Sequence, residues 1–588
     1  MPLPQTTSTH QTNQIYFWLF AILVVAASLR LYHLDALGIF FYEKATMMVS
    51  QGMVQNGGNQ HDVFNPQKYV FTNQEFWQPQ TLPEYLESMR RSDIGNSPFY
   101  YVLLHSWLKL TGISDFTARL FSVLFSVLTV WLIFIFVSHF FKSSKLALTA
   151  AALAAIEPFF VAYSQQARNY SLTFFLTLLA TYCFLRALEA EDKHKPSLRW
   201  FAFYGLVAGL SFLSHFLAAT VCLAHGLYAL VTVRRWRTWV ALIGAGALAV
   251  SGLAAWIIWG GGDWTLRSLN HQQAVYLECA FKRPYNNPYG IILPATFKNV
   301  FDKSLPIFTD LWSYSNSLVG TLEGKKNTIV ALLMGIGLIF AFRYAQKNRD
   351  KSMIVSAAAA VVLGGSALFY SNHKIGFVVA SVAILMLFLA FNQTTFKNKN
   401  LIWFLIIIAI IPSAFLIVNA VRSGHTYGLT QRYSGFSFPF VIILAGIALW
   451  QLVESQGWFK YLIITVLLLQ SVLIAGTLKS FYDDTSLKYN YRLTPRLPNP
   501  HYAAAQKALE IYEKGDTVLI GAPRNVYDNP MDRAFMDHSV TDAQYFNLYL
   551  PKDGIFVQRL DTLNVDKISL KKASGQLIEL TDLKGKRY

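Results

Sequence analysis

The sequence contains few charged residues. Only 14% of its 588 residues are Asp, Glu, Lys or Arg, whereas 54% are hydrophobic and 15% are aromatic. Soluble domains carry about 25% charged residues, so this composition excludes an ordinary water-soluble protein. Crossing a bilayer takes roughly 20 apolar residues, and the chain holds many runs of about that length. The sequence therefore predicts an integral membrane protein.

Cysteine and glycine-rich motifs are also scarce. The three cysteines, Cys183, Cys222 and Cys279, are scattered along the chain and have neither a disulfide-framework nor a zinc-site spacing. No glycine-rich phosphate loop precedes a helix, which argues against a soluble nucleotide-linked substrate. The residues require no cofactor. A divalent cation could bind among acidic side chains, but no ligand spacing indicates one, so no metal site is predicted.

Long apolar runs indicate a polytopic α-helical protein. We expect about 13 transmembrane helices, at residues 14–32, 117–139, 145–163, 170–188, 200–213, 215–233, 238–259, 327–345, 353–371, 374–391, 400–421, 434–453 and 459–478. The first run lacks a basic leader and a small-residue exit, so it indicates an uncleaved helix.

The distribution of positive charge gives the orientation. The formal net charge is +17, and with a cytoplasmic N-terminus most of the Lys and Arg between spans fall in inner loops. This is the positive-inside bias of membrane proteins, and it places the C-terminal region on the outer side. A nucleic-acid surface would need exposed aromatics interleaved with basic residues outside the membrane, and none is evident.

The chain divides into three parts. Residues 1–13 form a polar cytoplasmic leader, residues 14–478 the transmembrane domain with outer loops 33–116 and 260–326, and residues 479–588 a small soluble α/β domain outside the membrane. In that last part, 501–516 has helical periodicity and 517–521, 554–560 and 576–580 resemble short strands. Residues 97–112 are apolar but too short to cross, which favours a helix lying in the interface.

Ionisable residues gather at the outer ends of the spans. Placing a charge at membrane depth costs free energy, so these residues are functional candidates. Glu43 lies in "LRLYHLDALGIFFYEKAT" (29–46) and Asp93 in "RRSDIGNSPFYY" (90–101). Arg168 lies in "AAIEPFFVAYSQQARNY" (154–170), and Arg432 in "YGLTQRYSGFSFP" (427–439). The topology puts all of them on one side of the membrane, where carboxylates can act as bases and arginines can hold an anion.

These stretches, in this order and together with "RLFSVLFSVLTVW", resemble the GT-C class of bacterial glycosyltransferases that use polyprenyl-phosphate sugars. That class is related to the protein O-mannosyltransferases and the lipid A aminoarabinose transferase. The resemblance covers residues 14–240 well and the remaining spans loosely. It implies a GT-C-like fold and transfer of a sugar, with inversion, from a polyprenyl-phosphate donor among membrane lipids. The acceptor is a hydroxyl of a protein, of lipid A or of another glycan.

The resemblance also implies roles for individual residues. Glu43 is expected to be the catalytic base and Asp93 to assist it. The expected substrate-binding residues are Tyr42, Gln165, Gln166, Arg168, Tyr170, His215, Arg432 and Tyr433. Arg168 and Arg432 would neutralise the departing phosphate, since a guanidinium fork suits a pair of phosphate oxygens.

The chain departs from the family pattern at three places. Tyr42 stands where the family has a catalytic aspartate, and Gln166 stands where it has a glutamate. "DIGNSP" keeps Asp93 but has Asn96 and Ser97 in place of histidine and proline. Lost carboxylates matter because a positioned base contributes about 10²–10⁴-fold to the rate.

Two other functions fit parts of the sequence. The first alternative is a protein with the same fold but no catalytic activity, which binds a lipid phosphate or acts as a partner subunit because its catalytic carboxylates have been lost. The second is a transporter in which Glu157 and His215 relay protons. The large outer loops and the polar residues at one face favour the transferase over the transporter.

Overall fold

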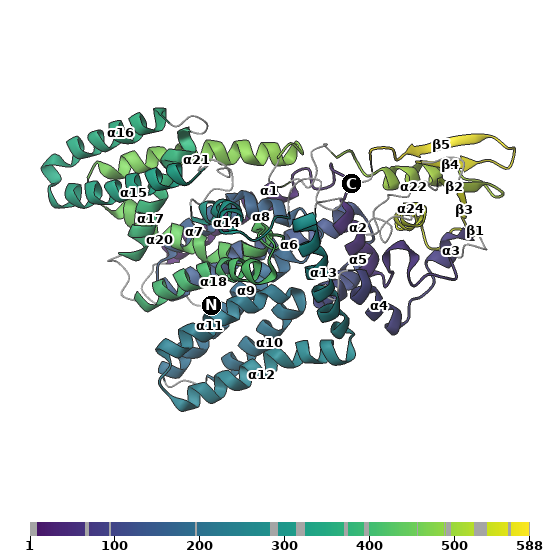
Figure 1. Ribbon diagram of the computed structural model, residues 1–588, viewed down its shortest axis with the longest axis horizontal. Coiled ribbons are helices and arrows are strands. Elements are labelled where there is room, and N and C mark those ends of the chain that lie inside the picture. The colour runs from purple at the N-terminus through teal and green to yellow at the C-terminus, as the bar shows by residue number, and fades with distance from the viewer. Residues whose placement is uncertain are drawn as a thin grey trace.

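The computed structural model consists of helices joined to one small β-sheet (Figure 1). It describes residues 9–64, 70–92, 96–193, 197–282, 292–312, 324–369, 374–392, 399–455, 457–486, 489, 496–521, 538–561 and 566–586. Helices occupy the left and centre of Figure 1, and the sheet lies at the right.

The long apolar runs form helices, because a helix satisfies its own backbone hydrogen bonds inside a bilayer. Within the described residues, nine helical segments are long and apolar enough to cross a membrane. They contain α1 (Thr9–Leu31), α6 (Asp115–Phe141), α9 (Tyr170–Asp192), α12 (Trp236–Trp259), α15 (Gly324–Lys347), α16 (Ser352–Leu368), α18 (Lys399–Ser423), α20 (Phe438–Glu454) and α21 (Phe459–Tyr482). The predicted polytopic helical membrane protein is confirmed.

The remaining predicted spans also coincide with helices, but these are shorter or bent. The shorter ones are α10 (Leu198–Ser214), α11 (Ala219–Thr232, after the 3-10 turn η2, Phe216–Ala218) and α17 (Lys374–Phe391). A further 3-10 turn, η4 (Arg349–Lys351), joins α15 to α16. The exact number of 13 crossings therefore stays a prediction.

The predicted span 145–163 is bent at its centre. Helices α7 (Ser144–Ile156) and α8 (Pro158–Ser164) meet at 56°, because Pro158 has no N–H for the carbonyl of Ala154 four residues earlier. The fully buried guanidinium of Arg30 in α1 donates instead to that carbonyl (3.2 Å) and to the next one (2.8 Å). Arg30 therefore stabilises the bend by satisfying carbonyls that the break leaves without helical partners.

The first outer loop contains short elements that pack at the outer ends of the spans. They are α2 (Phe41–Ser50), η1 (Gln55–Gly57), β1 (Val70–Thr72), α3 (Asn73–Phe76), α4 (Leu82–Ser92) and α5 (Pro98–Thr111). The predicted short helix at 97–112 is α5. It buries Tyr100, Leu104 and Leu108 at helical spacing, while Leu110 on its other side is exposed.

Further along the chain, two helices follow α12 and a pair of short turns precedes α20. The first two are α13 (Gly262–Lys282) and α14 (Phe297–Trp312), and the turns are α19 (Gln431–Ser434) and η5 (Gly435–Ser437). Both pairs fall at predicted outer ends of spans. Helix α13 packs against α4, so a segment far along the chain lies beside the first outer loop.

The C-terminal region contains both helices and strands. It contains α22 (Pro500–Ile511), β2 (Thr517–Gly521), α24 (His538–Asn547), β3 (Val557–Asp561), β4 (Lys567–Lys571) and β5 (Leu577–Asp582). The sheet order is β1-β3-β2-β4-β5, in which β2 and β3 are parallel and the other pairs are antiparallel. The three predicted strands are present, whereas β4 and α24 were not predicted.

The sheet includes a strand from outside residues 479–588. Strand β1 of the first outer loop pairs with β3, with Val70 opposite Arg559 and Thr72 opposite Val557. Beside it, the fully buried Asn73 donates to the carbonyls of Pro551 (2.7 Å) and Gly554 (2.8 Å). The first outer loop and the C-terminal region thus fold together, although the sequence suggested separate units.

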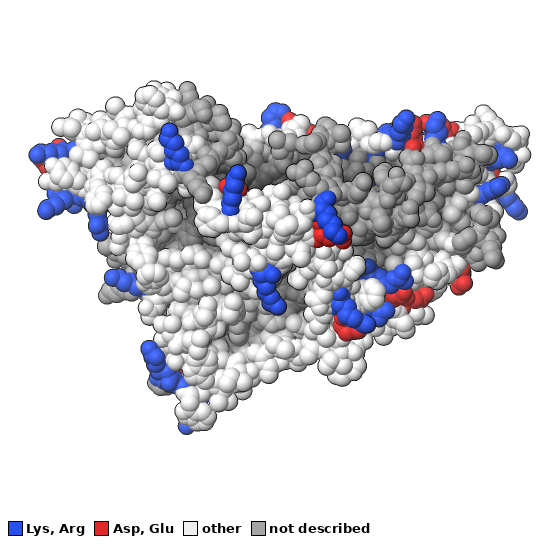
Figure 2. Space-filling view, in the orientation of Figure 1, with Lys and Arg blue, Asp and Glu red and all other residues white. Residues whose placement is uncertain are grey.

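The surface agrees with a membrane environment. In Figure 2 the helical body presents a largely uncharged surface, on which the Lys and Arg side chains are mostly isolated from one another. Apolar side chains on this body are widely exposed, including Trp236 (70%), Val361 (73%) and Phe369 (92%). Exposed basic residues lie at the α11–α12 and α15–α16 turns, which project away from the sheet in Figure 1. Lipid contact accounts for apolar exposure of this extent.

Candidate functional site

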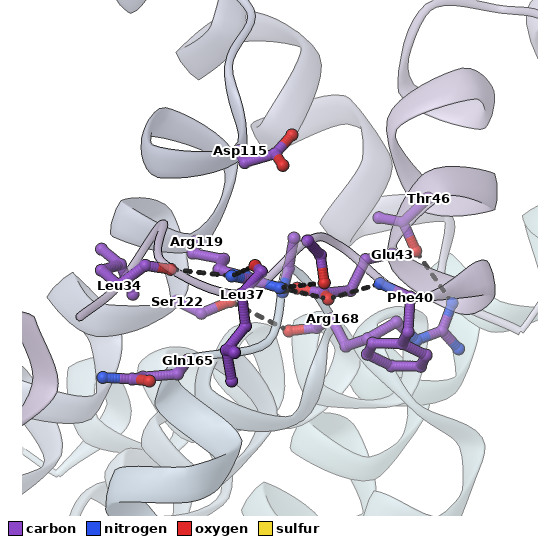
Figure 3. Close-up of polar contacts among 12 residues, drawn as sticks. Leu34, Leu37, Phe40, Glu43, Thr46, Asp115, Arg119, Ser122, Gln165 and Arg168 are labelled. Carbon is purple, nitrogen blue, oxygen red and sulfur yellow. Dashed lines mark hydrogen bonds and ion pairs between the residues drawn. The ribbon is translucent and has the colours of Figure 1, made fainter. Parts of the chain in front are cut away.

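Glu43 lies at the centre of a buried network and is paired with Arg119 (Figure 3). Arg119 Nε and Nη2 donate to the two carboxylate oxygens of Glu43, each at 2.9 Å. The backbone N–H of Ala167 donates to Oε1 (2.8 Å) and that of Phe40 to Oε2 (3.1 Å). Neither Glu43 nor Arg119 is more than 2% exposed. The bidentate pair fixes the carboxylate in one orientation.

Arg119 also organises the segment that follows α1. Its Nη1 donates to the carbonyls of Leu34 and Leu37, both at 2.7 Å, and its Nη2 approaches that of Gly38 (3.4 Å). All these acceptors lie in the turn between α1 and α2 (Figure 3). One arginine at the start of α6 therefore holds both the turn and the carboxylate that follows it.

The protonation of Glu43 should make the stability depend on pH. Burial acts to raise the pKa of Glu43, but the charge and hydrogen bonds of Arg119 outweigh it, so the pKa lies below its ordinary value of 4.5. A depressed folded-state pKa means that the unfolded chain takes up the proton first as pH falls. The stabilisation is thus complete above about pH 4.5 and decreases as the pH falls below that value toward the folded pKa.

We therefore expect the thermal unfolding midpoint of the purified protein to fall more steeply below pH 4.5 than that of Glu43→Gln. The amide cannot titrate, so it serves as the matched control. Parallel pH profiles for the two proteins would contradict the pairing.

The polar loop 165–169 is attached to the surrounding helices at almost every position. Gln165 Nε2 donates to the carbonyls of Arg30 (3.0 Å) and Tyr32 (2.7 Å) at the end of α1. Asn169 Nδ2 donates to Ser97 Oγ (2.7 Å) before α5 and to the carbonyl of Ser214 (2.6 Å) at the end of α10. The loop thus joins the C-terminal ends of α1 and α10 to the N-terminal end of α5.

Arg168 is the cation that this loop presents. Its Nη1 donates to Thr46 Oγ1 (2.9 Å) of α2, and its carbonyl accepts from Ser122 Oγ (3.2 Å) of α6. Its guanidinium carbon lies 5.8 Å from the ring centroid of Tyr42, which is 42% exposed. Tyr42 and Arg168 therefore lie together at the border between the buried network and the surface.

The other predicted residues form a chain of ring contacts. The ring centroids of Tyr170, at the start of α9, and His215 are 6.2 Å apart, and those of His215 and Tyr433 are 5.8 Å apart. The guanidinium of Arg432 lies 4.8 Å from the ring of its neighbour Tyr433. His215 also accepts a hydrogen bond from the N–H of Leu217 (3.1 Å).

The predicted site residues thus fall into two groups. The first group meets at α2 and consists of Tyr42, Glu43 and the loop 165–168. The second group is a series of contacts that begins at the start of α9 and runs through Tyr170, His215, Tyr433 and Arg432. Gln166 lines a small polar pocket beside Arg119, together with His33 and Arg496. Asp93 lies outside the described residues.

Glu157, considered above for a proton relay, has a local structural role. Its carboxylate Oε1 accepts from the N–H of Phe159 (3.4 Å) and so caps α8 immediately before Pro158.

A second buried carboxylate lies near this network, and the sequence did not predict it. Asp115, at the start of α6, accepts hydrogen bonds from Asn499 Nδ2 (3.0 and 3.2 Å) and from Tyr549 Oη. Burial, together with the charge of Asp115, raises the pKa of Tyr549 well above 10, so its hydroxyl stays protonated and donates. The C-terminal region therefore reaches α6 only one helical turn from Arg119.

Arg119 and Asp115 were detectable in principle. A charged residue in the first turns of a 27-residue apolar span is costly without a partner. That cost signals a pairing, but the partners lie 76 and 384 positions away and cannot be chosen from local pattern. Among the described residues, no group of three or more His, Cys, Asp or Glu side chains is arranged to hold a metal ion.

Comparisons with known proteins agree with the sequence resemblance. Residues 96–259 match the family model described as dolichyl-phosphate-mannose-protein mannosyltransferase. The comparison with curated proteins finds no match.

Similar solved structures include ArnT from Cupriavidus metallidurans bound to undecaprenyl phosphate, at 13% identity and a TM-score of 0.42, covering 91% of this chain and 85% of that one. They also include the oligosaccharyltransferase AglB from Archaeoglobus fulgidus in complex with an inhibitory peptide and a dolichol-phosphate, at 14% identity and a TM-score of 0.41, covering 93% of this chain and 62% of that one. The family match confirms, over residues 96–259, the resemblance to protein mannosyltransferases that the sequence predicted.

Proposed function

We propose that the protein transfers a sugar from a polyprenyl-phosphate donor to an acceptor hydroxyl at the periplasmic face of a bacterial inner membrane. One observation carries the proposal. The loop 165–169 is bound against α2, so that Arg168 lies beside Tyr42 at the outer ends of several spans. This arrangement occurs in a chain whose residues 96–259 match a mannosyltransferase family model.

In the proposed reaction, the acceptor oxygen attacks the anomeric carbon on the side opposite the phosphate. The bond from that carbon to the phosphate oxygen breaks, and polyprenyl phosphate leaves with the bonding electrons, which inverts the anomeric centre. Arg168 and Arg432 neutralise the charge on the departing phosphate. Charge-assisted hydrogen bonds from guanidinium are well suited to this task.

The acceptor proton must pass to a base. Glu43 is a poor candidate because four donors occupy its two oxygens and its pKa is lowered. We assign Glu43 a positioning role, in which it holds Ala167 and therefore Arg168 in place. Asp93 is then the proposed base, since the sequence predicts it at the same outer face.

An apolar cavity provides a place for the lipid chain of the donor. It has a volume of about 280 Å³ and is lined by α7, α17, α20 and α21, through residues such as Ile156, Met386 and Leu444. Helix α7 leads through α8 to the loop that carries Arg168, and α20 begins after η5, six residues beyond Arg432. Two of the helices that line the cavity are thus close in sequence to the proposed phosphate-binding residues. Its apolar lining suits an isoprenoid segment.

The orientation of the chain follows from the same reasoning. We propose that the N-terminus is cytoplasmic and that the sheet lies in the periplasm. The exposed basic turns at α11–α12 and α15–α16 support this, because they lie away from the sheet in Figure 1 and inner loops attract Lys and Arg.

The function can be tested with purified protein in liposomes containing labelled polyprenyl-phosphate sugars and a panel of hydroxyl acceptors. We expect wild-type protein to form product, and Arg168→Ala to lower kcat/KM by about 10–100-fold through loss of a charge-assisted contact. Arg267→Ala, at an exposed arginine of α13, is the matched control and should retain wild-type activity. Product formation unaffected by Arg168→Ala would remove this residue from the site.

A second function is favoured by a specific observation. Tyr42 replaces the family aspartate and Glu43 is fully occupied, which fits a protein that binds the lipid phosphate without turning it over. Saturable binding of polyprenyl phosphate, without product from any donor or acceptor, would support this binding function. The variant Asp93→Asn distinguishes the enzyme from the binding protein. It should lower the turnover of an active enzyme, whereas a binding protein has no turnover to lose.

A further inference from the structure

Two tyrosines outside the predicted set form a stacked pair next to the site. Tyr276 of α13 and Tyr427 of the segment between α18 and α19 have ring centroids 3.9 Å apart and an interplanar angle of 20°. Both side chains are partly exposed. Two segments separated by about 150 residues in sequence thus form one aromatic stack, in which each ring keeps its outer face for other contacts.

The segment that carries Tyr427 is held rigidly. The N–H of Thr426 donates to the carbonyl of Leu293 (2.9 Å), and the N–H of Ala295 donates to that of Gly424 (2.8 Å). His425, only 4% exposed, accepts from the N–H of Tyr427 (3.3 Å) and lies 5.7 Å from the ring of Tyr276. The pair is therefore set in position before any ligand arrives.

Tyr427 of the stacked pair lies a few residues before Arg432 and Tyr433 in the chain. The N–H of Tyr433 donates to the carbonyl of Thr430 (3.2 Å), so a tight backbone turn joins Tyr427 to Tyr433. Tyr433 lies against Arg432, and Tyr42 lies against Arg168. Each proposed phosphate-binding arginine therefore contacts a tyrosine, and the tyrosine at Arg432 follows Tyr427 after one short turn.

Four tyrosines beside two arginines match the chemistry of a sugar phosphate. A pyranose ring has apolar C–H faces that pack on aromatic rings, and its hydroxyls can exchange hydrogen bonds with phenol groups. Tyrosines at a membrane interface also occur as a belt of single side chains. A belt does not explain a rigid stacked pair assembled from two segments, with a third and a fourth tyrosine each placed on an arginine.

We propose that Tyr276 and Tyr427, with Tyr42 and Tyr433, form the subsite for the sugar of the polyprenyl-phosphate donor. This inference rests on the proposed function. The arginines would hold the phosphate, while the tyrosines would recognise the sugar attached to it. Discrimination between a sugar-bearing lipid and the bare lipid phosphate would then depend on the tyrosines alone.

The test compares two probes, a polyprenyl-phosphate hexose and bare polyprenyl phosphate, each titrated into the purified full-length protein in nanodiscs. We expect wild-type protein to bind the sugar-bearing lipid more tightly. Tyr276→Ala and Tyr427→Ala should each weaken binding of that lipid by about tenfold, and leave binding of the bare lipid within about twofold. Tyr344→Ala, at a half-exposed tyrosine of α15, is the control and should change neither.

The outcomes separate this inference from the proposed function. Equal weakening for both lipids, or no weakening for either, would overturn the sugar subsite. Failure of wild-type protein to bind either lipid would overturn the proposed function and the subsite with it. Tyr276→Phe and Tyr427→Phe keep the aromatic rings, so they control for misfolding of the alanine variants. Because they lose only the hydroxyl, we expect their affinity for the sugar-bearing lipid, and for that lipid only, to fall by about two- to threefold.

Discussion

Replacing Arg119 with methionine is expected to lower the free energy of unfolding by about 3–5 kcal/mol, the usual cost of breaking a buried ion pair from one side. The variant leaves Glu43 buried without its cation and removes the donors to the carbonyls of Leu34 and Leu37. The measurement is the thermal unfolding midpoint of detergent-purified protein, together with the fraction that remains monodisperse. Donor binding should fall as well, since Glu43 holds the backbone next to Arg168.

A double-mutant cycle isolates the pair from general damage. Removing both charges in Glu43→Met/Arg119→Met should be less destabilising than Arg119→Met alone, because no unpaired carboxylate remains. Arg267→Met, at a pair that is exposed on both sides, is the matched control and should change the midpoint little. An Arg119→Met protein that unfolds like wild type would show that the pair does not hold the site together.

Much of the fold follows from simple patterns in the sequence. Apolar runs of membrane length give the long helices, and the shortness of the apolar run at 97–112 gives α5. The sequence also predicts Glu43 and Arg168 on one side of the membrane, and in the structure the N–H of Ala167, next to Arg168, donates to Glu43 at 2.8 Å. These features depend on local hydrophobicity or on which side of a bilayer a loop emerges, and both are properties that a linear pattern contains.

The identity of polar partners could not be predicted in the same way. Lys44 and Arg30 are close to Glu43 in the sequence, but Arg30 donates to carbonyls at the α7–α8 bend, and the distant Arg119 pairs with the carboxylate. Pairing depends on how helices pack, which hydrophobic periodicity does not encode. The same limit applies to Tyr276 and Tyr427, whose stacking requires α13 to lie against the loop after α18.

The independence of the C-terminal region was also overestimated. The sequence shows where polarity rises after the last span, but β1 has only three residues and no strand signal of its own. It becomes a strand because β3 offers an open edge and Asn73 fixes the chain beside it. Tertiary context therefore decides that element, and it connects the first outer loop to the region that also contacts Asp115 through Tyr549.

Replacing Asn73 with alanine is expected to cost about 1–3 kcal/mol, because three backbone groups lose their partner at once and one of them, the N–H of Phe556, is buried. Its amide donates to the carbonyls of Pro551 and Gly554, and its Oδ1 accepts from the N–H of Phe556 (2.8 Å). The measurement is hydrogen–deuterium exchange of residues 70–76 and 551–561 in the purified protein. Because β1 and β3 share one edge of the sheet, both segments should lose protection together.

A matched control tests whether the effect belongs to the joint between the two segments. Gln78→Ala changes an exposed amide five residues away and should exchange like wild type. Asn73→Asp keeps the acceptor but loses both donors, so we expect an intermediate loss of protection in the same two segments. Faster exchange in residues 551–561 alone would mean that the C-terminal region opens independently of β1. The first outer loop would then fold without it, and Asp115 would be linked to the sheet only through the side chains of Asn499 and Tyr549.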